Sequence, residues 1–406
     1  MKTLAEEGPN KLSLSRDMVQ VEDTAFSSNR GYYDNPLNLV ISSATPSASI
    51  IYTTDGTMPS GENGISGDKG MPVVILIEKS TIVRAIAVGK GMIPSDVDTH
   101  TYLFREDILK QIRPEGFPST VDFEMDLRIP LDENLSKRMM SSFLEVPSVS
   151  VVMDHNDLFG PRGIYTNPLE SGEEWERLAS VELITPLRKK GFQINCGTRI
   201  QGSGSRNTSS KKNFRLKFSA KFGPKKLKAK LFTESDVSEF DSLVLRNPTH
   251  DSWLAVTPDW RNNARYVNDR WASETQRKMG YPSPHQRWIH LYLNGLYWGI
   301  YALSERPDES FMASYFGGDK SDYDVLNSNL LRNGSRDSFD QARDLIRIQG
   351  CETREDYLEL QKFIDLDAFI DYFLYRAPPE TYFSSESQIL IFQKSSKPLK
   401  SYLRSF

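Results

Sequence analysis

The sequence predicts an α+β fold in which a small β-sandwich precedes a sheet-rich half and a helical half. Short apolar runs separated by turn residues fill residues 31–104, and further β-type runs follow from Pro147. Helical spacing of apolar residues dominates after residue 307. A length of 406 residues is enough for two to three domains at roughly 150 residues each. A sheet-rich half followed by a helical half predicts two lobes with a binding cleft between them.

The composition excludes two broad classes of protein. Hydrophobic residues make up 38% and charged residues 26% of the chain, so the chain can build real cores and is not disordered as a whole. The longest apolar runs, such as Val73–Ile77, fall far short of the ~20 residues of a membrane helix, so we expect no transmembrane segment. Fifty basic and 54 acidic residues give a net charge of −4, which argues against a general binder of polyanions.

The two cysteines and five histidines predict neither a disulfide framework nor a zinc site. We expect Cys196 and Cys351 to be two free thiols, with one bridge between them as the alternative. The histidines show no spacing typical of metal ligands. The first residues lack the apolar stretch of a secretory signal peptide. This start indicates either an intracellular protein or a sequence without its true N-terminus.

The first 146 residues divide into three segments. Residues 1–30 are polar and predict a tail or linker. Residues 31–104 predict a β-sandwich, although a β-rich part of something larger would need the same strands. Its runs are Leu37–Ile41, Ile50–Thr54, Pro72–Ile77, Thr81–Val88 and Thr99–Phe104, with Asp55-Gly56 as a tight turn. Residues 105–146 form a connector with short helices expected over 107–112 and 135–144.

Residues 147–406 predict the second unit. Its expected strands cover residues 147–153, 163–165, 180–184, 191–194 and 211–218. A helix over 261–279 should end at Gly280. Asn294-Gly295 between two aromatic runs predicts a β-hairpin with a type I′ turn. Further helices are expected over 307–316, 339–348 and 354–375.

A basic run is the most conspicuous charge pattern. Ten basic residues and no acidic residue lie between Arg206 and Lys230, and such a run is most often a solvated face. Within it, strand alternation sets Asn213, Arg215 and Lys217 on one face, opposite Lys212, Phe214, Leu216 and Phe218. Lys212 thus lies on an apolar face, where its amine needs a carboxylate or a phosphate.

The residues around Lys212 suggest an anion site. Gly202–Arg206 could let backbone N–H groups approach an anion that Arg206 grips, although an ordinary turn explains the same residues. Glu305, at the end of the second hairpin strand, and Glu182, inside an apolar strand, are candidate partners for the amine. An exposed acid at a strand end explains Glu305 equally well. The sequence contains no GxSxG, HExxH or P-loop motif, and no pair of carboxylates stands out as that of a hydrolase.

Several of these segments resemble the spore coat H (CotH) kinase family. The similar segments follow the family's order and are Arg199–Arg206, Lys211–Leu216, Leu227–Phe232, Leu243–Asn247, His290–Tyr301 and Ser304–Pro307. The resemblance runs from about Pro147 to at least Asn327. Residues 31–104 resemble the small sandwich domain found at the C-terminus of chitobiases. That module often precedes CotH regions in large bacterial surface or secreted proteins.

The resemblance implies a function. It makes residues 147–406 an atypical, distantly kinase-like two-lobe domain that phosphorylates serine or threonine of surface or coat proteins, using ATP and Mg²⁺ or Mn²⁺. Arg199, Arg206, Lys212 and Glu305 would bind the nucleotide, with Lys212 pairing with its phosphates. The protein would be secreted or lie at the cell surface, and its partner would be a protein substrate or another surface protein.

The C-terminal part departs from the family. A catalytic Asp with an Asn shortly after it, and then a metal-binding Trp-Asp-Leu-Asp-like segment, should follow the helix that ends near Tyr375. Residues 379–392 contain neither Asp nor Asn, and their only acids are Glu380 and Glu386. Phosphoryl transfer needs such groups. No catalytic or metal-binding residue can therefore be assigned, and we expect either a truncated fragment or a pseudokinase that is inactive as this chain. Asp251 and Asp269 are the nearest replacements.

Two other functions are weighed against the kinase. The chain could be a non-catalytic surface or coat protein that uses the sandwich as a spacer and the kinase-like unit as a binding platform. Nucleic-acid binding through residues 206–230 is weaker, because four acids follow between residues 234 and 241 and the net charge is negative. If Lys212 contacts ATP, Lys212→Ala should weaken binding at least tenfold (about 1.4 kcal/mol or more), while Lys217→Ala should change it little.

Overall fold

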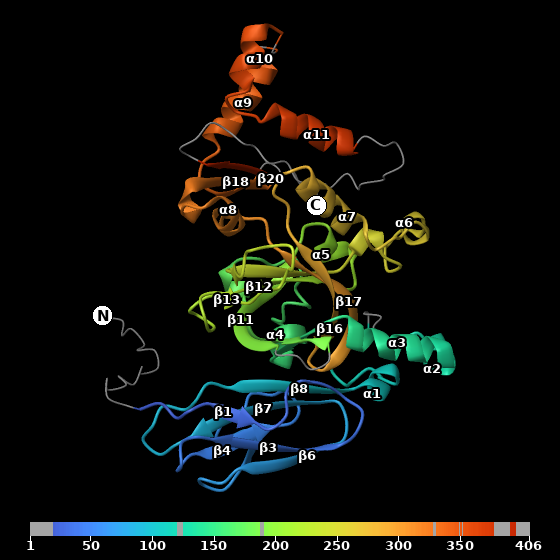
Figure 1. The fold of residues 1–406 in the computed structure, drawn as a ribbon, viewed down its shortest axis with the longest axis vertical. Coiled ribbons are helices and arrows are strands. Elements are labelled where there is room, and N and C mark those ends of the chain that lie inside the picture. The colour runs from blue at the N-terminus through green and yellow to red at the C-terminus, as the bar shows by residue number, and fades with distance from the viewer. Residues whose placement is uncertain are drawn as a thin grey trace, which may run out of the picture.

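The computed structural model of the chain describes residues 19–119, 125–186, 191–327, 330–348, 350, 352–376 and 390–394. A β-rich N-terminal region, a closed β-barrel and a helical region follow one another along the chain and along the longest axis of the molecule (Figure 1). The mixed α/β fold with a β-rich N-terminal region confirms that part of the predicted fold class.

The N-terminal region consists of two sheets that pack face to face. β1 (Thr24–Phe26), β3 (Leu37–Ser43) and β6 (Val73–Ile77) form one sheet. β2 (Gly31–Tyr33), β8 (Asp98–Phe104), β7 (Thr81–Val88), β4 (Ser49–Thr53) and β5 (Ile65–Ser66) form the other. Leu39 and Ile41 from the first sheet share a buried core with Val83 and Tyr102 from the second. Strand alternation therefore produces the apolar layer that a sandwich requires.

Three helices connect the sandwich to the barrel. They are α1 (Arg105–Leu109), α2 (Arg128–Leu131) and α3 (Glu133–Glu145). Asp132 caps α3, because its Oδ1 accepts hydrogen bonds from the backbone N–H groups of Asn134 and Leu135 at 2.8 and 3.0 Å. Phe143 is the fully buried residue of this helix. The two short helices expected in the connector are thus present at shifted bounds.

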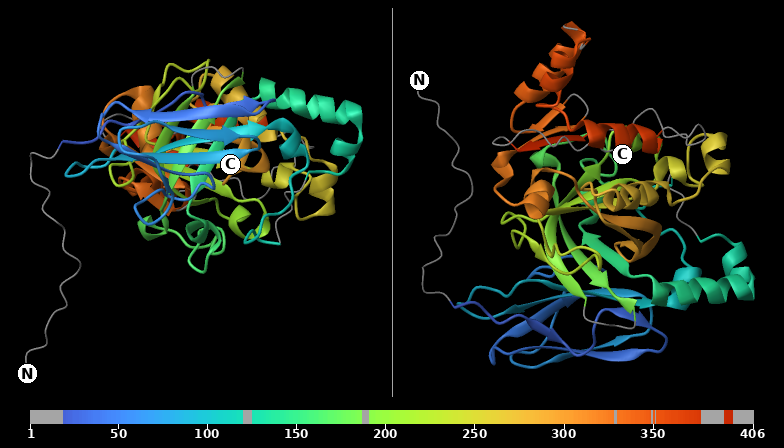
Figure 2. Two further views of the ribbon diagram at one scale, coloured as in Figure 1. Left: turned by 90° about the horizontal axis from the view of Figure 1, so that it is seen from below. Right: turned by 45° about the horizontal axis from the view of Figure 1, so that its top comes forward.

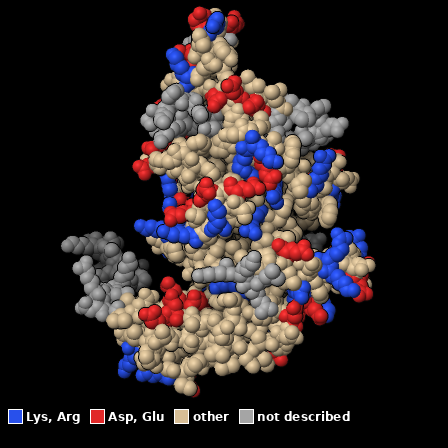
Figure 3. Space-filling view, in the orientation of Figure 1, with Lys and Arg blue, Asp and Glu red and all other residues tan. Residues whose placement is uncertain are grey.

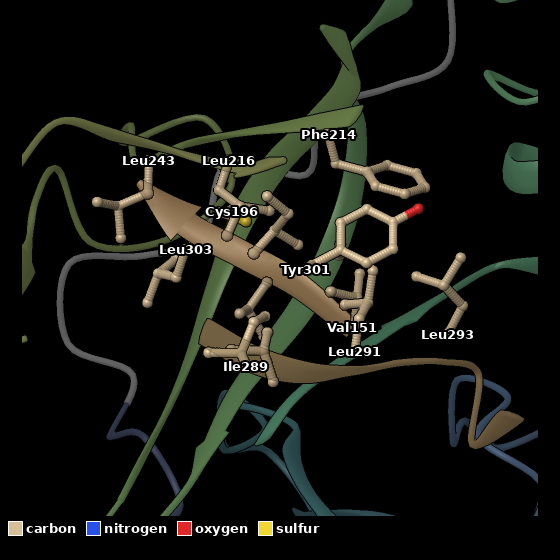
Figure 4. Close-up of a cluster of buried hydrophobic side chains, with 14 of the residues drawn as sticks. Val151, Cys196, Phe214, Leu216, Leu243, Ile289, Leu291, Leu293, Tyr301 and Leu303 are labelled. Atoms are coloured by element: carbon tan, nitrogen blue, oxygen red, sulfur yellow. The ribbon is translucent and has the colours of Figure 1, made fainter. Parts of the chain in front are cut away.

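Seven strands close into a barrel. In spatial order they are β10 (Arg177–Ile184), β11 (Phe192–Gln201), β12 (Asn213–Lys217), β15 (Ser242–Arg246), β17 (Leu296–Glu305), β16 (Gln286–Leu293) and β9 (Ser148–Met153). Because seven is an odd number, a closed ring of seven strands must contain at least one parallel pair. Here that pair is β9 and β16. The interior is filled by apolar side chains, among them Phe214, Leu216, Leu243 and Leu303 (Figure 4). Cys196 is a buried free thiol in this core, and Cys351 lies outside the described residues.

The hairpin predicted at Asn294-Gly295 is confirmed. Both residues have positive φ angles, 45° and 79°, as a type I′ turn requires, and β16 pairs with β17 on either side. The Asn294 side chain also accepts a hydrogen bond from the Met153 N–H at 2.9 Å and donates one to the Met153 carbonyl oxygen at 3.0 Å. The turn is therefore tied to the end of β9.

The region after the barrel contains most of the remaining helices. They are α8 (Glu309–Phe316), α9 (Asp337–Ile348), α10 (Arg354–Leu360) and α11 (Leu366–Arg376), beside a sheet of β19 (Leu330–Asn333), β18 (Tyr323–Asn327) and β20 (Leu390–Lys394). Shorter elements are α4 (His155–Phe159), α5 (Ser205–Thr208), β13 (Leu227–Lys228) and β14 (Glu239–Phe240). The predicted helix over 354–375 is divided into α10 and α11. Among the described residues, no helix is long and apolar enough to cross a membrane.

The helix predicted over 261–279 is also divided, into α6 (Pro258–Asn262) and α7 (Asn268–Lys278). Tyr266 has a φ of 64°, which a right-handed helix does not allow. Asp251 stabilises this break. Its two carboxylate oxygens accept hydrogen bonds from the backbone N–H groups of Arg265 and Asn268, at 2.7 and 3.0 Å. A contact from outside the segment therefore overrides its helical pattern.

The sandwich packs directly against the barrel through a buried polar junction (Figure 2). The Tyr32 hydroxyl of β2 lies 2.6 Å from Ser148 Oγ and 2.9 Å from the Tyr292 hydroxyl, both on barrel strands. Glu182 of β10 is fully buried and accepts hydrogen bonds from the N–H and the hydroxyl of Thr101. The sandwich is thus a fixed neighbour of the barrel in this structure.

Removal of the Tyr32 hydroxyl tests this junction. We expect Tyr32→Phe to lower the free energy of unfolding by about 1–3 kcal/mol, because Ser148 and Tyr292 would lose a buried hydrogen-bond partner. Tyr52→Phe is the matched control, because the Tyr52 hydroxyl makes no hydrogen bond with the described residues. Denaturant unfolding followed by fluorescence and circular dichroism measures both. Equal stability of the two variants would contradict a structural role for the junction.

The buried Glu182 carboxyl should make stability depend on pH. Burial raises its pKa above the usual 4.5, against the opposing effect of Arg30, which lies 3.5 Å away. The folded protein therefore holds this proton more tightly than the unfolded chain, so stability is lost as the pH rises from about 4.5 through the raised pKa. As the pH rises through this range, we expect wild type to lose stability relative to Glu182→Gln, whose side chain carries no titratable proton. A difference that does not vary with pH would contradict the expectation.

Candidate functional site

Arg206 organises the loops at one end of β11. It lies in α5, directly after the predicted glycine loop. Its guanidinium donates hydrogen bonds to the carbonyl oxygens of Gly202, Glu170, Ile200 and Pro168, at 2.6, 2.8, 2.9 and 3.1 Å. Burial lowers the pKa of Arg206, and the neighbouring Arg199 adds to this effect. The side chain thus joins residues 168–170 to the start of the loop that leads into β12.

Lys212 completes this loop from the other side. Its Nζ donates hydrogen bonds to the carbonyl oxygens of Arg206 and Ser209, at 2.7 and 2.6 Å. The residue is buried, and this burial lowers the pKa of its amine. An ammonium group has three donors, and two of those of Lys212 are used within the described residues. Lys212 is therefore held at the rim of the barrel by backbone carbonyl groups.

Glu305 lies in a different buried network. Its carboxylate accepts hydrogen bonds from the His285 N–H at 2.8 Å and the Tyr315 hydroxyl at 2.8 Å, and His285 Nδ1 lies 2.9 Å away. Burial raises the pKa of Tyr315, and the Glu305 carboxylate raises it further. The Tyr315 hydroxyl also contacts Ser235 Oγ at 2.8 Å. This network joins the end of β17 to α8.

The suggested pairing of Lys212 with Glu305 is not formed. Strand register explains why: Phe214 lies level with Leu245 and Leu303, so Lys212 lies level with Tyr301, whose hydroxyl donates to the Lys212 carbonyl oxygen at 3.0 Å. Glu305 is four residues further along the same strand, roughly 13 Å at 3.3 Å per residue. The other suggested partner, Glu182, is bound to Thr101 and Arg30 at the sandwich.

Arg199 lies on the outer face of β11, beside a buried carboxylate. Its Nη1 donates a hydrogen bond to the Gly172 carbonyl oxygen at 2.8 Å and lies 3.6 Å from Glu176 Oε1. Glu176 follows the short 3₁₀ turn η1 (Glu173–Trp175) and is also 3.7 Å from Lys217 Nζ. Lys217 contacts Glu173 at 2.9 Å. Of the four predicted residues, Arg206 and Lys212 thus share one loop, Arg199 lies on the adjacent outer face, and Glu305 is separate.

The two aspartates considered as catalytic replacements are both engaged. Asp251 binds backbone N–H groups through both oxygens, as described above. Asp269 Oδ2 accepts a hydrogen bond from Gln286 at 2.5 Å and lies 3.4 Å from Arg246. Within the described ranges, no group of three or more His, Cys, Asp or Glu side chains could hold a metal ion. Glu380 and Glu386 lie outside those ranges.

The C-terminal part of the basic run is paired with acids. Lys226 and Lys228 lie 3.4 and 3.1 Å from Glu239, and Lys230 lies 3.7 Å from Asp236. Figure 3 accordingly shows basic and acidic side chains mixed across the middle of this face. Such mixing disfavours the nucleic-acid hypothesis, because a nucleic-acid site needs a continuous basic surface.

Comparison with known families gives two matches. The family model described as CotH kinase protein matches residues 198–377, from β11 to just past α11. The family model described as Fn3 associated matches residues 39–102, within the sandwich. The first match supports the CotH resemblance, whereas the second does not bear out the likeness to chitobiases. No curated protein matches the chain.

Arg215 was not among the site residues predicted from the sequence, although strand alternation predicts the face on which it lies. Strand alternation sets Arg215 and Lys217 on the face of β12 opposite Phe214 and Leu216, and the structure confirms this division. The apolar face fills the barrel interior, where no ligand can enter. The polar face, with Arg199 across the ladder from Arg215, is the one that a ligand could reach.

Lys212→Met tests the role of Lys212 in the loop. We expect it to lower the free energy of unfolding by about 1–3 kcal/mol, because two carbonyl oxygens would lose a charged donor. Lys228→Met is the control, since Lys228 is exposed and surface ion pairs contribute about 0–1 kcal/mol. Thermal unfolding measures both variants. A loss no larger than that of the control would show that the carbonyl contacts do not hold the loop.

Proposed function

We propose that this chain carries the nucleotide-binding part of a CotH-like atypical protein kinase with a two-lobe, kinase-like arrangement. The complete enzyme would use ATP to phosphorylate serine or threonine of a protein substrate at the cell surface or in a coat. The CotH match supports this proposal, since it covers both the barrel strands around Lys212 and the helical region that follows. The proposed location, secreted or at the cell surface, rests on the family resemblance.

The single observation that carries the proposal is the gathering of cations where β11 leads into β12. Two of the three donors of the Lys212 amine are used by carbonyl groups, and Arg199 is close enough to Arg206 to lower its pKa. We assign Lys212, Arg206 and Arg199 to the nucleotide phosphates, to which fixed cationic donors bind strongly. Glu305 would act indirectly, by holding the junction between β17 and α8 through Tyr315.

We further propose that this chain, as it stands, transfers little or no phosphate. ATP supplies the phosphoryl group, and the chain must orient the acceptor hydroxyl and neutralise the phosphates. No Asp follows Asp371 in the sequence, and Asp251 and Asp269 are occupied by other contacts. The described residues also offer no set of ligands for the Mg²⁺ or Mn²⁺ that such kinases use.

A non-catalytic binding platform is the second candidate. The occupied aspartates favour it, because they leave a domain that could bind a nucleotide or a protein without phosphoryl transfer. The sandwich fixed to the barrel would extend the surface available to a partner. Protein substrates and surface proteins are therefore both possible partners of this region.

Binding and transfer should be measured separately. We expect ATP with Mg²⁺ or Mn²⁺ to raise the melting temperature, and transfer of labelled γ-phosphate to a serine-rich protein to stay near background. The absence of both effects would overturn the kinase-like proposal. Robust transfer that is lost in Asp251→Asn or Asp269→Asn, and kept in the exposed control Asp259→Asn, would overturn the proposed inactivity.

A further inference from the structure

Arg215 is a partly buried cation on the outer face of the barrel. It is the central residue of β12 and pairs in register with Arg199 of β11 and Val244 of β15. Its Nε is buried without a hydrogen-bond partner among the described residues, and no ion pair of that part of the chain includes its guanidinium. An arginine in this position is costly, because the buried part of its guanidinium loses contact with water without gaining a hydrogen bond.

The neighbours of Arg215 increase this cost. Burial lowers its pKa to about 10, and Arg306 and Arg199 contribute to this through repulsion between like charges. Asp308 and Glu176 raise the pKa of Arg215, but their effect is smaller than that of burial and repulsion. The face therefore brings together three guanidinium groups, from β11, from β12 and from the residue that follows β17.

The two nearby acids face other cations, although Glu176 Oε1 makes no hydrogen bond within the described residues. Asp308 pairs with Arg306, accepts a hydrogen bond from Ser242 at 3.4 Å, and caps α8 through its other oxygen. Glu176 lies between Arg199 and Lys217. Neither acid forms an ion pair with Arg215. An anion from outside the described chain would supply the missing compensation.

A phosphate group suits this arrangement best. Guanidinium groups match phosphate oxygens with two parallel N–H donors, and several arginines around one phosphate are a common way to bind it. The face also lies where a nucleotide of the proposed kinase would be expected. Figure 1 shows β12 on the side of the barrel toward α8 and β18, and the hydrogen bond between Ser242 and Asp308 joins this face to α8.

We propose that Arg215, together with Arg199 and Arg306, binds a phosphate group of the nucleotide on the outer face of the barrel. This inference rests on the proposed kinase-like function and specifies its phosphate site. It moves the principal phosphate contact from Lys212, on the rim, to the polar face of the same strand. Lys212 then supports the site by holding the loop between α5 and β12.

The variant Arg215→Met separates binding from stability. Methionine keeps an unbranched side chain as far as the position of the arginine Nε and removes the charge. Without ligand, we expect an unchanged or higher melting temperature, because a partly buried charge without an ion-pair partner is removed. With ATP, we expect at least a tenfold weaker binding in calorimetry. Lys228→Met is the matched control and should bind ATP as wild type does. A large loss of stability without ligand, with ATP binding unchanged, would show a purely structural role.

The remaining outcomes distinguish this inference from the proposed function. If wild type and Arg215→Met bind ATP equally, the phosphate site is overturned and the kinase-like proposal stands. If wild type binds no ATP, the kinase-like proposal is overturned, and pyrophosphate is then the probe. Stabilisation of wild type but not of Arg215→Met by pyrophosphate would keep the phosphate site and overturn the nucleotide as its source. No effect of pyrophosphate on wild type would overturn both.

Discussion

The closure of seven strands into one barrel is the constraint on which the rest of the structure depends. In a closed barrel each strand residue points either into the core or outward, with no third option. The interior is occupied by apolar side chains such as Phe214 and Leu303, so any ligand must bind outside it or at its ends. Closure thereby decides which face of β12 can have a function. It also leaves Lys212 at the rim, where the backbone carbonyl groups of Arg206 and Ser209 hold its amine.

The outer surface of the barrel is used in two different ways. The side formed by β9, β10 and β16 carries Ser148, Glu182 and Tyr292, which are buried against the sandwich with their hydrogen bonds made. The side formed by β11 and β12 carries Arg199 and Arg215, and the latter has no such compensation. The sandwich thus fixes one side of the barrel, and the helical region begins at the other.

The sequence allowed the local features to be predicted and left the long-range ones open. The turn at Asn294-Gly295 and the two faces of β12 follow from neighbouring residues, and both predictions are confirmed. The break at Tyr266 was not predicted because it depends on Asp251, which lies outside the predicted helix over 261–279. The Asp251 carboxylate accepts a hydrogen bond from the backbone N–H of Arg265 beside the break. The partners of Lys212 were missed because they are carbonyl groups, which every residue carries. The sequence pattern also gave no sign that the barrel closes, although closure is what excludes a ligand from the apolar face.

The most direct measurement is a structure of the full chain with a non-hydrolysable ATP analogue. On this account, a phosphate of the analogue lies on the outer face of β12, with its oxygens ~2.7–2.9 Å from the guanidinium of Arg215 and close to Arg199 and Arg306. A bound analogue with none of its phosphates at the guanidinium of Arg215 would contradict it.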